Sequence, residues 1–415
     1  MQMTVPAASA VPLADVDLYP ASFYRLGDPH AAWRTLRAQA PTWRQHAPDG
    51  TEFWSVTRYH DVVAVLKDTR RFSSEYSTML SALAGDTAKG KAIHLTDPPR
   101  HGVLRTATVQ ALSTRVMRDR EPRVRARIAA MVDAAIGESA GEGATDFAAL
   151  AMAVPMAATG EVLGVPPECW ADVARWTMAS MAPEDPAYRG DDPQATLMDA
   201  HISLFALFAD LIQQRRDRPT GDVVSLLAAL ELDGRAATDE EVLVNCYAFI
   251  MGAIPTVPQV ASHLALAAAH DPDLWRRLAT DPQVRSTALE EALRWSSPIN
   301  HLLRRTTEPV LLGGETVPEG ALVAAWIGSA NHDEDVFPSP HTFIADRRPN
   351  PHIAFGAGPH RCIGNPPARA GLSILLDELT RKVAAIEPVG DAAHLESNFL
   401  NGITRLPLRL HPRAG

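Results

Sequence analysis

Cysteine is scarce in this sequence, and the few cysteines do not pair. Only three occur among 415 residues, at Cys169, Cys246 and Cys362, in unrelated surroundings. An odd, scattered set is not a disulfide framework and fits a reducing compartment. The absence of CxxC pairs also argues against a zinc site of the paired-cysteine kind.

Long apolar runs and excess positive charge are also missing. No apolar run approaches the roughly 20 residues that a membrane helix needs, and the N-terminal stretch lacks the basic start and long apolar core of a secretory signal. The formal net charge of -10 argues against general nucleic-acid binding. We therefore expect a cytoplasmic protein without membrane or nucleic-acid partners.

Helical patterning is abundant. Hydrophobic residues make up 46% of the chain and charged residues 21%, the ordinary range for a globular protein. Short alternating stretches interrupt the helical segments, and one of them turns at Gly-Gly and Pro-Glu-Gly, as hairpins do. The pattern predicts a mainly α-helical fold with a minor β portion at approximately 20–70, 298–330 and 395–412, in a single domain spanning residues 1–415.

One segment is strongly basic although the whole chain has a negative net charge. Between Arg100 and Arg127 there are eight arginines and only two acids. Such a run is usually a solvated helix face, and a docking surface for an acidic partner is the alternative. The eight are Arg100, Arg105, Arg115, Arg118, Arg120, Arg123, Arg125 and Arg127.

A long central helix has a clear start signal and is interrupted by proline. Thr238 and Glu241 form a capping box, and from there to about His270 nearly all residues are apolar, which is typical of a helix buried in the middle of a fold. Pro255 and Pro258 each remove a backbone donor and collide with the carbonyl four residues earlier. The helix should kink there, either for packing or at a functional site.

Cys362 lies in the glycine-rich loop "FGAGPHRCIG", directly before an amphipathic helix. Pro366 and Pro367 suit the first turn of that helix, where the missing donors would be unpaired anyway. A cysteine at a helix start faces free amides and the positive end of the helix dipole, which stabilise a thiolate. The glycines let the backbone pass close to something flat and bulky. A buried cysteine in a tight turn is the alternative.

This loop resembles the haem-ligand loop of the cytochrome P450 family of haem-thiolate oxygenases, and the resemblance covers nearly the whole chain in order. It implies a triangular helical body with a small sheet domain. It also implies haem b (iron protoporphyrin IX) held by Cys362 as the thiolate and metal ligand, with Phe355 and Gly364 in the cofactor-binding loop.

Further residues match the family's ion-pair helix. Glu291 and Arg294 resemble its ExxR motif, in which the ion pair closes on an arginine before the cysteine loop. Arg347 and Arg348 are the candidates for that arginine here. The spacing of three puts Glu291 and Arg294 on one helix face.

Four basic residues match the family's contacts to the haem propionates. His101 and Arg105 are one turn apart on one helix face, as two anionic groups require. Arg304 and His360 match the remaining contacts. Each alone would more often be a surface or satisfied polar residue, and together they are better explained by a bound porphyrin carboxylate pair.

The resemblance also indicates where in the fold the proline break lies. In this family the central helix crosses the distal face of the haem and carries the pattern A/G-G-x-D/E-T-T, which relays protons. Aligned on Gly252, the acid position is Ile254 and the first threonine position is Pro255. We therefore expect an atypical relay, in which Thr256, Gln259, ordered water or a polar group of the substrate replaces the usual side chains.

Two classes of function remain open. The first is a monooxygenase that uses O2 and takes electrons from NAD(P)H through a ferredoxin reductase and a ferredoxin. The second is a haem-thiolate enzyme that bypasses the relay, using peroxide or nitric oxide, or forming a ring or cross-link without inserting oxygen. A haem sensor is a more distant reading. We expect a monomer in either class.

The family's substrate-recognition regions predict a largely apolar pocket for a mid-sized organic molecule, such as a secondary metabolite. Asn300, His301 and Asn401 are candidate polar anchors in it. The predicted pocket residues are Met79, Leu83, Ala248, Met251, Ile299, Asn300, His301, Phe399 and Leu400.

Overall fold

Helices make up most of the computed structural model, which describes residues 11–26, 28–141 and 143–413. The ends of the predicted domain, 1–10 and 414–415, lie outside the described residues. The helices are α1 Ala21–Leu26, α2 Pro29–Gln39, α3 Tyr59–Lys67, α4 Arg100–Val109, α5 Thr114–Glu138, α6 Phe147–Leu163, α7 Trp170–Met181, α8 Pro193–Asp217, α9 Val223–Ala228, α10 Asp239–Ala253, α11 Val257–His270, α12 Pro272–Thr280, α13 Pro282–Ser296, α14 Ile327–Ala330 and α15 Asn365–Lys382.

The strands are short and mostly lie in the expected regions. They are β1 Thr42–His46, β2 Glu52–Val56, β3 Phe72–Ser73, β4 Thr145–Asp146, β5 Glu231–Leu232, β6 Arg235–Ala236, β7 His301–Thr306, β8 Val310–Leu312, β9 Glu315–Val317, β10 Leu322–Trp326, β11 Val383–Pro388, β12 Ala393–His394, β13 Ile403–Arg405 and β14 Pro407–Pro412. The strands β4, β5, β6 and β11 lie outside the predicted β portion, and β3 and β12 lie just beyond its bounds. The mainly helical fold with a small sheet is as the sequence predicts.

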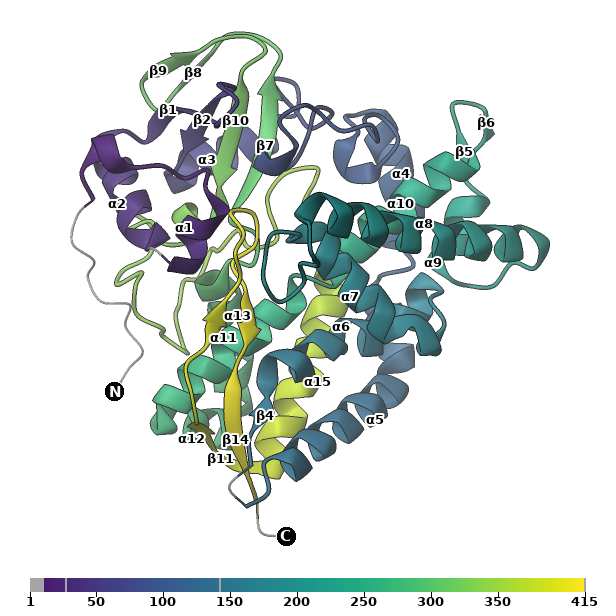
Figure 1. Cartoon of the computed structure of the whole chain (residues 1–415), viewed down its shortest axis with the longest axis vertical. Coiled ribbons are helices and arrows are strands. Elements are labelled where there is room, and N and C mark those ends of the chain that lie inside the picture. Colours follow the sequence, from purple (N-terminus) through teal and green to yellow (C-terminus); the bar gives the residue numbers. More distant parts are fainter. Residues whose placement is uncertain (1–10, 27, 142, 414–415) are drawn as a thin grey trace.

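The largest sheet has the order β1-β2-β10-β7-β3, with β10 parallel to β2 and the other pairs antiparallel. It forms one corner of the molecule, and helices make up most of the other two (Figure 1). The predicted Gly-Gly turn joins β8 to β9, and both Gly313 and Gly314 have positive φ, as a tight hairpin turn requires. A second sheet, β11-β14-β4, lies beside α5 and α12 at the C-terminal end of the chain.

Several helices begin at an Asp-Pro pair, because the two residues together reduce the number of unpaired amides in the first turn. The side chains of Asp28, Asp192, Asp271 and Asp281 accept hydrogen bonds from free amides of the first turn, and the following proline has no amide to satisfy. The capping box at Thr238 is confirmed, since its hydroxyl accepts from the Glu241 amide at 3.2 Å and the Glu241 carboxylate accepts from the Thr238 amide at 2.8 Å.

The central helix is broken where the prolines predict. α10 ends at Ala253, residues 254–256 form a turn, and α11 begins at Val257 with Pro258 in its first turn. α11 is buried along nearly its whole length and packs against α6, α13 and β11 in the main hydrophobic cluster. The break therefore divides a core helix rather than a surface one.

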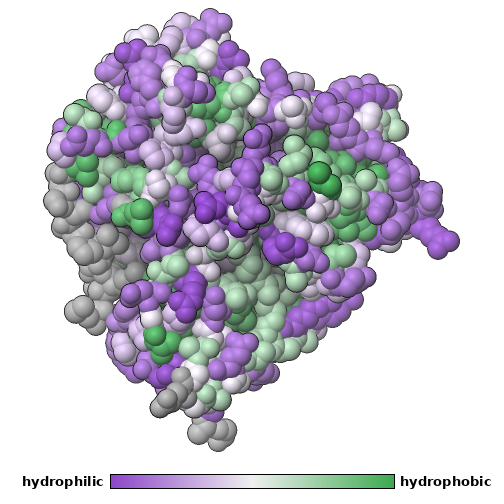
Figure 2. Space-filling view, in the orientation of Figure 1, coloured by the Kyte–Doolittle hydropathy of each residue, from purple (hydrophilic) through white to green (hydrophobic). Residues whose placement is uncertain are grey.

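Two helical stretches are long and apolar enough to cross a membrane, α8 and the combined stretch Asp239–His270. This differs from the sequence-based expectation, but it is weak evidence, because the buried core helix of a globular protein passes the same test. The second stretch is such a core helix. On the face shown in Figure 2, polar residues cover most of the surface, and an apolar group lies over α8, where Met198 and Ile202 are 56% and 59% exposed.

Candidate active site

A cavity of about 960 Å³ lies between the broken central helix and the cysteine loop. Its walls come from α4, α6, α8, α10, α11, α15 and the strand β7, so segments far apart in the sequence meet there. The sulfur-bearing residue Cys362, the helix-break residue Thr256 and the basic residues Arg105 and Arg304 all line it. The sequence-derived candidates thus converge on one space.

The cysteine loop is held in a tight, specific path. The Cys362 amide donates to the Phe355 carbonyl at 2.8 Å, which closes the loop. Gly358 has φ of +71°, and a Cβ there would lie 2.7 Å from the Leu66 carbonyl oxygen, so only glycine lets the loop approach α3 this closely. α15 starts directly after Gly364, with prolines in its first turn as predicted.

The environment of the Cys362 sulfur only partly favours a thiolate. The residue is exposed toward the cavity, yet it lies deep inside the protein, and this burial raises the pKa of the thiol. Hydrogen bonds from the Gly364 and Asn365 amides and the charge of Arg105 oppose that rise but do not outweigh it. The amides at the helix start therefore act in the predicted direction, but they do not offset the effect of burial. A bound metal cation would supply the missing stabilisation.

A group of basic side chains beside the cavity has no anionic partner within the described residues. Arg304 is 2% exposed, its side chain donates to the Leu303 carbonyl at 2.7 Å, and burial lowers its pKa to about 10. Arg105 donates to the Arg361 carbonyl at 2.7 Å. Burying a guanidinium without a carboxylate is costly, so this arrangement calls for an anionic ligand.

Two histidines, His101 and His360, complete this group, and a third, His94, was not predicted from the sequence. The rings of His101 and His360 lie 4.0 Å apart, and the buried Nε2 of His360 has no hydrogen-bond partner. Burial, reinforced by Arg304, lowers the pKa of His360 to about 2, so the ring is neutral. His94 lines the same part of the cavity, and its pKa is about 4 because of burial. No sequence motif pointed to His94.

These residues fit haem. The cavity is large enough for a flat macrocycle, its sulfur is accessible, and its partnerless guanidiniums and the orphaned His360 nitrogen suit a pair of carboxylates.

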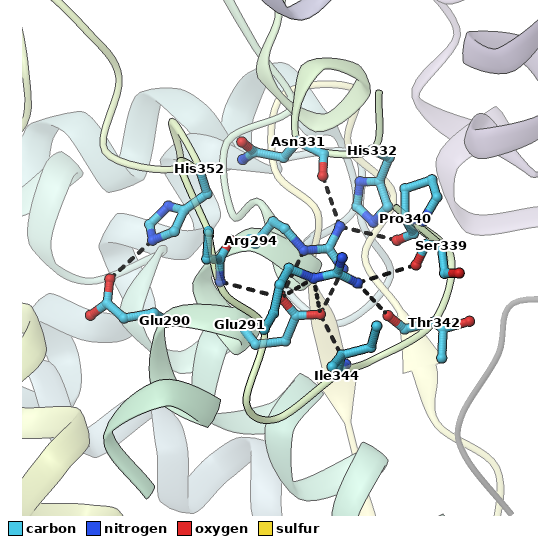
Figure 3. Close-up of polar contacts among 12 residues, drawn as sticks. Glu290, Glu291, Arg294, Asn331, His332, Ser339, Pro340, Thr342, Ile344 and His352 are labelled. Atoms are coloured by element: carbon cyan, nitrogen blue, oxygen red, sulfur yellow. Dashed lines mark hydrogen bonds and ion pairs between the residues drawn. The ribbon is translucent and has the colours of Figure 1, made fainter. Parts of the chain in front are cut away.

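The ion-pair helix is closed as the resemblance implies. Glu291 and Arg294 are both fully buried and form a two-bond pair at 2.8 Å, shown in Figure 3. Arg347 also contacts the Glu291 carboxylate, at 3.0 and 3.1 Å, and Ile344 donates its amide to it at 3.0 Å. Arg347 is therefore the closing arginine, while Arg348 is exposed.

A second carboxylate pair was not foreseen. Glu290, next to Glu291, accepts hydrogen bonds from Arg369 of α15 at 2.6 and 2.7 Å and from His352 at 3.0 Å. Burial raises the pKa of Glu290, but these bonds outweigh it and lower the pKa to about 2. Arg369 also lies over the Phe355 ring, 4.5 Å from its centroid. Acidic and basic residues this far apart give no sequence signal of their pairing.

The structure corrects the alignment of the helix break. Thr256 lines the cavity, and its hydroxyl donates to the Gly252 carbonyl at 3.0 Å, whereas Ile254 and Pro255 do not line it. Ile254 is fully buried in the hydrophobic cluster on the other side of the helix. The family pattern therefore aligns one position later. Thr256 takes the place of the first threonine, and Pro255 takes the place of the acid.

Gln259 is also corrected. It is 1% exposed and does not line the cavity, because its side-chain oxygen accepts a hydrogen bond from the Ile403 amide at 2.7 Å. It connects α11 to β13 and is not available to relay protons. Gly252 does line the cavity, as expected.

Five of the nine predicted pocket residues line the cavity, and four do not. Met79, Ala248, Met251, Ile299 and Phe399 line it. Leu83 and Leu400 are instead buried in separate hydrophobic clusters.

The side chains of the predicted polar anchors form hydrogen bonds to backbone groups instead of facing a ligand. The Asn300 side chain donates to the Asn398 carbonyl at 3.2 Å, and the Asn401 side chain donates to the Ser296 carbonyl at 2.5 Å. His301 Nε2 accepts from the Leu80 amide at 3.1 Å while Nδ1 lies 3.2 Å from the Asn398 carbonyl. Burial lowers the pKa of His301 to about 3, in keeping with a neutral ring.

This chain is similar to known proteins over nearly its whole length. The family model "Cytochrome P450" matches residues 194–383. Linalool 8-monooxygenase of Pseudomonas putida is 29% identical over 96% of this chain and 99% of the relative. Cytochrome P450 NovI of Streptomyces niveus is 31% identical over 98% of this chain and 99% of the relative. The crystal structure of P450 OxyD, involved in the biosynthesis of vancomycin-type antibiotics, has a TM-score of 0.86 at 31% identity, covering 96% of this chain and 100% of that one.

The fold and the cavity thus define a haem-thiolate oxidoreductase. The chain belongs to the cytochrome P450 family of monooxygenases, which hold haem through a cysteine thiolate and receive electrons from redox partners.

We predict that Arg347→Ala lowers the free energy of unfolding by about 3–5 kcal/mol, because it leaves the fully buried Glu291 carboxylate with one cation instead of two. The exposed neighbour gives a matched control, since Arg348→Ala should change the free energy by no more than about 0.5 kcal/mol. Denaturant unfolding and the haem content of the purified variants measure the difference. Equal losses in both variants would contradict the assignment of Arg347.

Proposed function

We propose that this monooxygenase oxidises a mid-sized, largely apolar organic molecule, with Cys362 as the haem ligand and with electrons from a ferredoxin and a ferredoxin reductase. One observation carries the proposal: Cys362 and the hydroxyl-bearing Thr256 line the same, mainly apolar cavity. Residues 1–415 act as a single cytoplasmic domain in this proposal. The names of the relatives, from a linalool monooxygenase to an antibiotic-biosynthesis enzyme, support a secondary metabolite of this size.

The residues around the sulfur bind and orient the cofactor. Arg105 and Arg304 bind its carboxylates, and the neutral rings of His101 and His360 have donors to offer to the same groups. Haem held by a cysteine thiolate supplies oxygen activation, since the thiolate increases electron density at the iron and favours O–O cleavage.

In the turn between α10 and α11, Thr256 is the residue that can hold a proton. Its hydroxyl hydrogen is donated to the Gly252 carbonyl, so its oxygen is left to accept a hydrogen bond from water in the cavity. Pro255 has no amide, so it cannot donate to the carbonyl of Met251 four residues earlier, and that carbonyl can order a water nearby. Neither Pro255 nor Ile254 can pass a proton, so Thr256 acts with water or with a polar group of the substrate.

Pro255 also supports a second candidate function. An enzyme driven by peroxide or nitric oxide, or one that forms a bond without inserting oxygen, has less need of an acidic residue beside the threonine. Pro255 at the acid position is the observation that favours this alternative.

The arginine run is only partly a free basic surface. Arg100, Arg123, Arg125 and Arg127 pair with acidic residues, and Arg105 faces the cavity. Arg115 and Arg118, at the start of α5, are exposed and form no ion pair within the described part of the chain. They follow α4, which contacts the cysteine loop through the bond from Arg105 to Arg361. An acidic ferredoxin docked there would lie close to the haem sulfur.

Replacing the sulfur tests the ligand assignment. Cys362→Ser should lose the red-shifted Soret band of the reduced carbon monoxide complex, because a serine oxygen is not a thiolate ligand. Cys169→Ser and Cys246→Ser are the matched controls and should keep it. A Cys362→Ser protein that retains this band would refute the assignment.

Removing the hydroxyl tests the relay. Thr256→Val should lower the product formed per NAD(P)H consumed by about tenfold or more, because the proton-holding group is lost. Thr159→Val is a matched control, since Thr159 also lines the cavity and donates to a carbonyl four residues earlier. An unchanged Thr256→Val would assign the protons to water or substrate. A wild type that turns over with peroxide but not with a ferredoxin and reductase would refute the oxygenase proposal.

Charge reversal tests the partner surface. Changing Arg115 and Arg118 together to Glu should slow reduction by an acidic ferredoxin, and added salt should slow the wild type, since both effects weaken charge steering. The pair Arg189→Glu and Arg218→Glu makes the same charge change at exposed positions elsewhere and should have little effect. Stopped-flow reduction rates that do not depend on salt would place docking elsewhere.

A further inference from the structure

The cavity wall contains a polar pair that no sequence motif indicates. His201 Nε2 of α8 lies 2.9 Å from the Tyr247 hydroxyl of α10, and both residues line the same cavity as Cys362. Their nearest neighbours along α10 on the cavity wall, Leu243, Val244 and Ala248, are apolar, and Glu240, two turns before Tyr247, pairs with Lys91. A hydrogen-bonded pair on an apolar wall is the kind of polar feature that orients a ligand.

Aromatic packing holds this pair in place. The Phe205 ring stacks parallel to the His201 ring at 5.6 Å, and it meets the Tyr247 ring edge-on at 5.3 Å. The Ser180 hydroxyl donates to the Thr177 carbonyl at 2.9 Å and is also a side-chain hydrogen-bond partner of Tyr247. Because packing fixes both rings, a ligand would find them already in position.

The pair has hydrogen-bonding capacity left over. Burial lowers the pKa of His201, against a smaller opposite effect of Asp86, and burial raises the pKa of Tyr247 to about 12, so both are neutral near pH 7. A neutral imidazole and a phenol have two N–H or O–H donors between them, and the bond that joins them uses one. The second donor is the Tyr247 hydroxyl or the His201 Nδ1–H, according to the tautomer of the imidazole, and both belong to residues that line the cavity.

The pair lies far along the helix from the residue that handles protons. Tyr247 precedes Ala253, the last residue of α10, by six positions, and a helix rises about 1.5 Å per residue, so the pair lies about 9 Å along the axis before the turn that carries Thr256. Between them, Ala248, Met251 and Ala253 line the cavity with apolar side chains.

We propose that His201 and Tyr247 bind a carbonyl or hydroxyl oxygen of the substrate. The substrate is then an elongated, mostly apolar molecule with an oxygen function at one end, and it is oxidised at a carbon near the other end. This inference rests on the proposed oxygenase function, because it names the substrate class of the same cavity.

Matched ligands that differ by one oxygen test the proposal. Dodecan-2-one, dodecan-1-ol and dodecane are titrated into the full-length, haem-loaded protein, and the dissociation constants are taken from the change in the Soret band. The wild type should bind the two oxygenated ligands more tightly than dodecane. Tyr247→Phe should weaken binding of the oxygenated ligands by about 5- to 10-fold, the value of one hydrogen bond, and leave dodecane binding unchanged.

Two further variants separate recognition from packing. Tyr19→Phe makes the same change elsewhere on the cavity wall and should leave all three constants unchanged. His201→Phe keeps a flat ring and should show the same ligand selectivity as Tyr247→Phe, with a double variant little worse than either single one, because the pair acts as a unit.

A wild type with no preference for the oxygenated ligands, whether it binds all three or none, overturns the proposal. Equal weakening for all three ligands in Tyr247→Phe also overturns it, since that would indicate a packing role. The carbon monoxide spectrum of the same samples reports the haem ligand independently, so failure of this inference is distinguishable from failure of the proposed function.

Discussion

The site depends on the buried carboxylate of Glu291. An unpaired carboxylate with no exposure would be strongly destabilising, so α13 can occupy the core only if cations are brought to it. Arg294 comes from the same helix, and Arg347 comes from the segment that leads to the cysteine loop. The adjacent Glu290 pairs with Arg369 of α15, after the loop. Neighbouring carboxylates on one helix therefore hold the chain on both sides of Cys362, which positions the sulfur without any contact to it.

The broken central helix solves a different problem on the other wall. A continuous helix would use every carbonyl internally, whereas the turn at residues 254–256 leaves Thr256 facing the cavity with its hydroxyl on the Gly252 carbonyl. The break does not loosen the core, because α11 resumes at once and Gln259 attaches it to β13. Proline thus changes which groups face the cavity while the packing around α11 is retained. The chain therefore has no acidic side chain at position 255 but retains the hydroxyl of Thr256.

Local chemistry explains what could be predicted from the sequence. The capping box at Thr238, the Gly-Gly hairpin, the glycine-rich cysteine loop and the helix break all follow from short-range rules about amides, φ angles and proline, and the structure contains each of them. Side-chain direction was less predictable. A register error of one residue rotates a helix position by about 100°, which is why the sequence alignment gives Ile254 and Pro255 the acid and threonine positions that Pro255 and Thr256 occupy in the structure. Partners distant in sequence, such as Glu290 with Arg369, leave no local signal.

The misassigned polar residues show why substrate recognition is the hardest part to predict. Asn300 and His301 lie in a segment that borders the cavity, yet backbone amides and carbonyls nearby use their polar atoms first, because a buried backbone group without a partner is costly. A polar side chain is free to recognise a ligand only after such needs are met. In this cavity His201 and Tyr247 meet that condition, since they bond to each other and not to a backbone group. A site built to hydrogen-bond an oxygen discriminates against a ligand that lacks it more strongly than an apolar wall can distinguish one methylene from another.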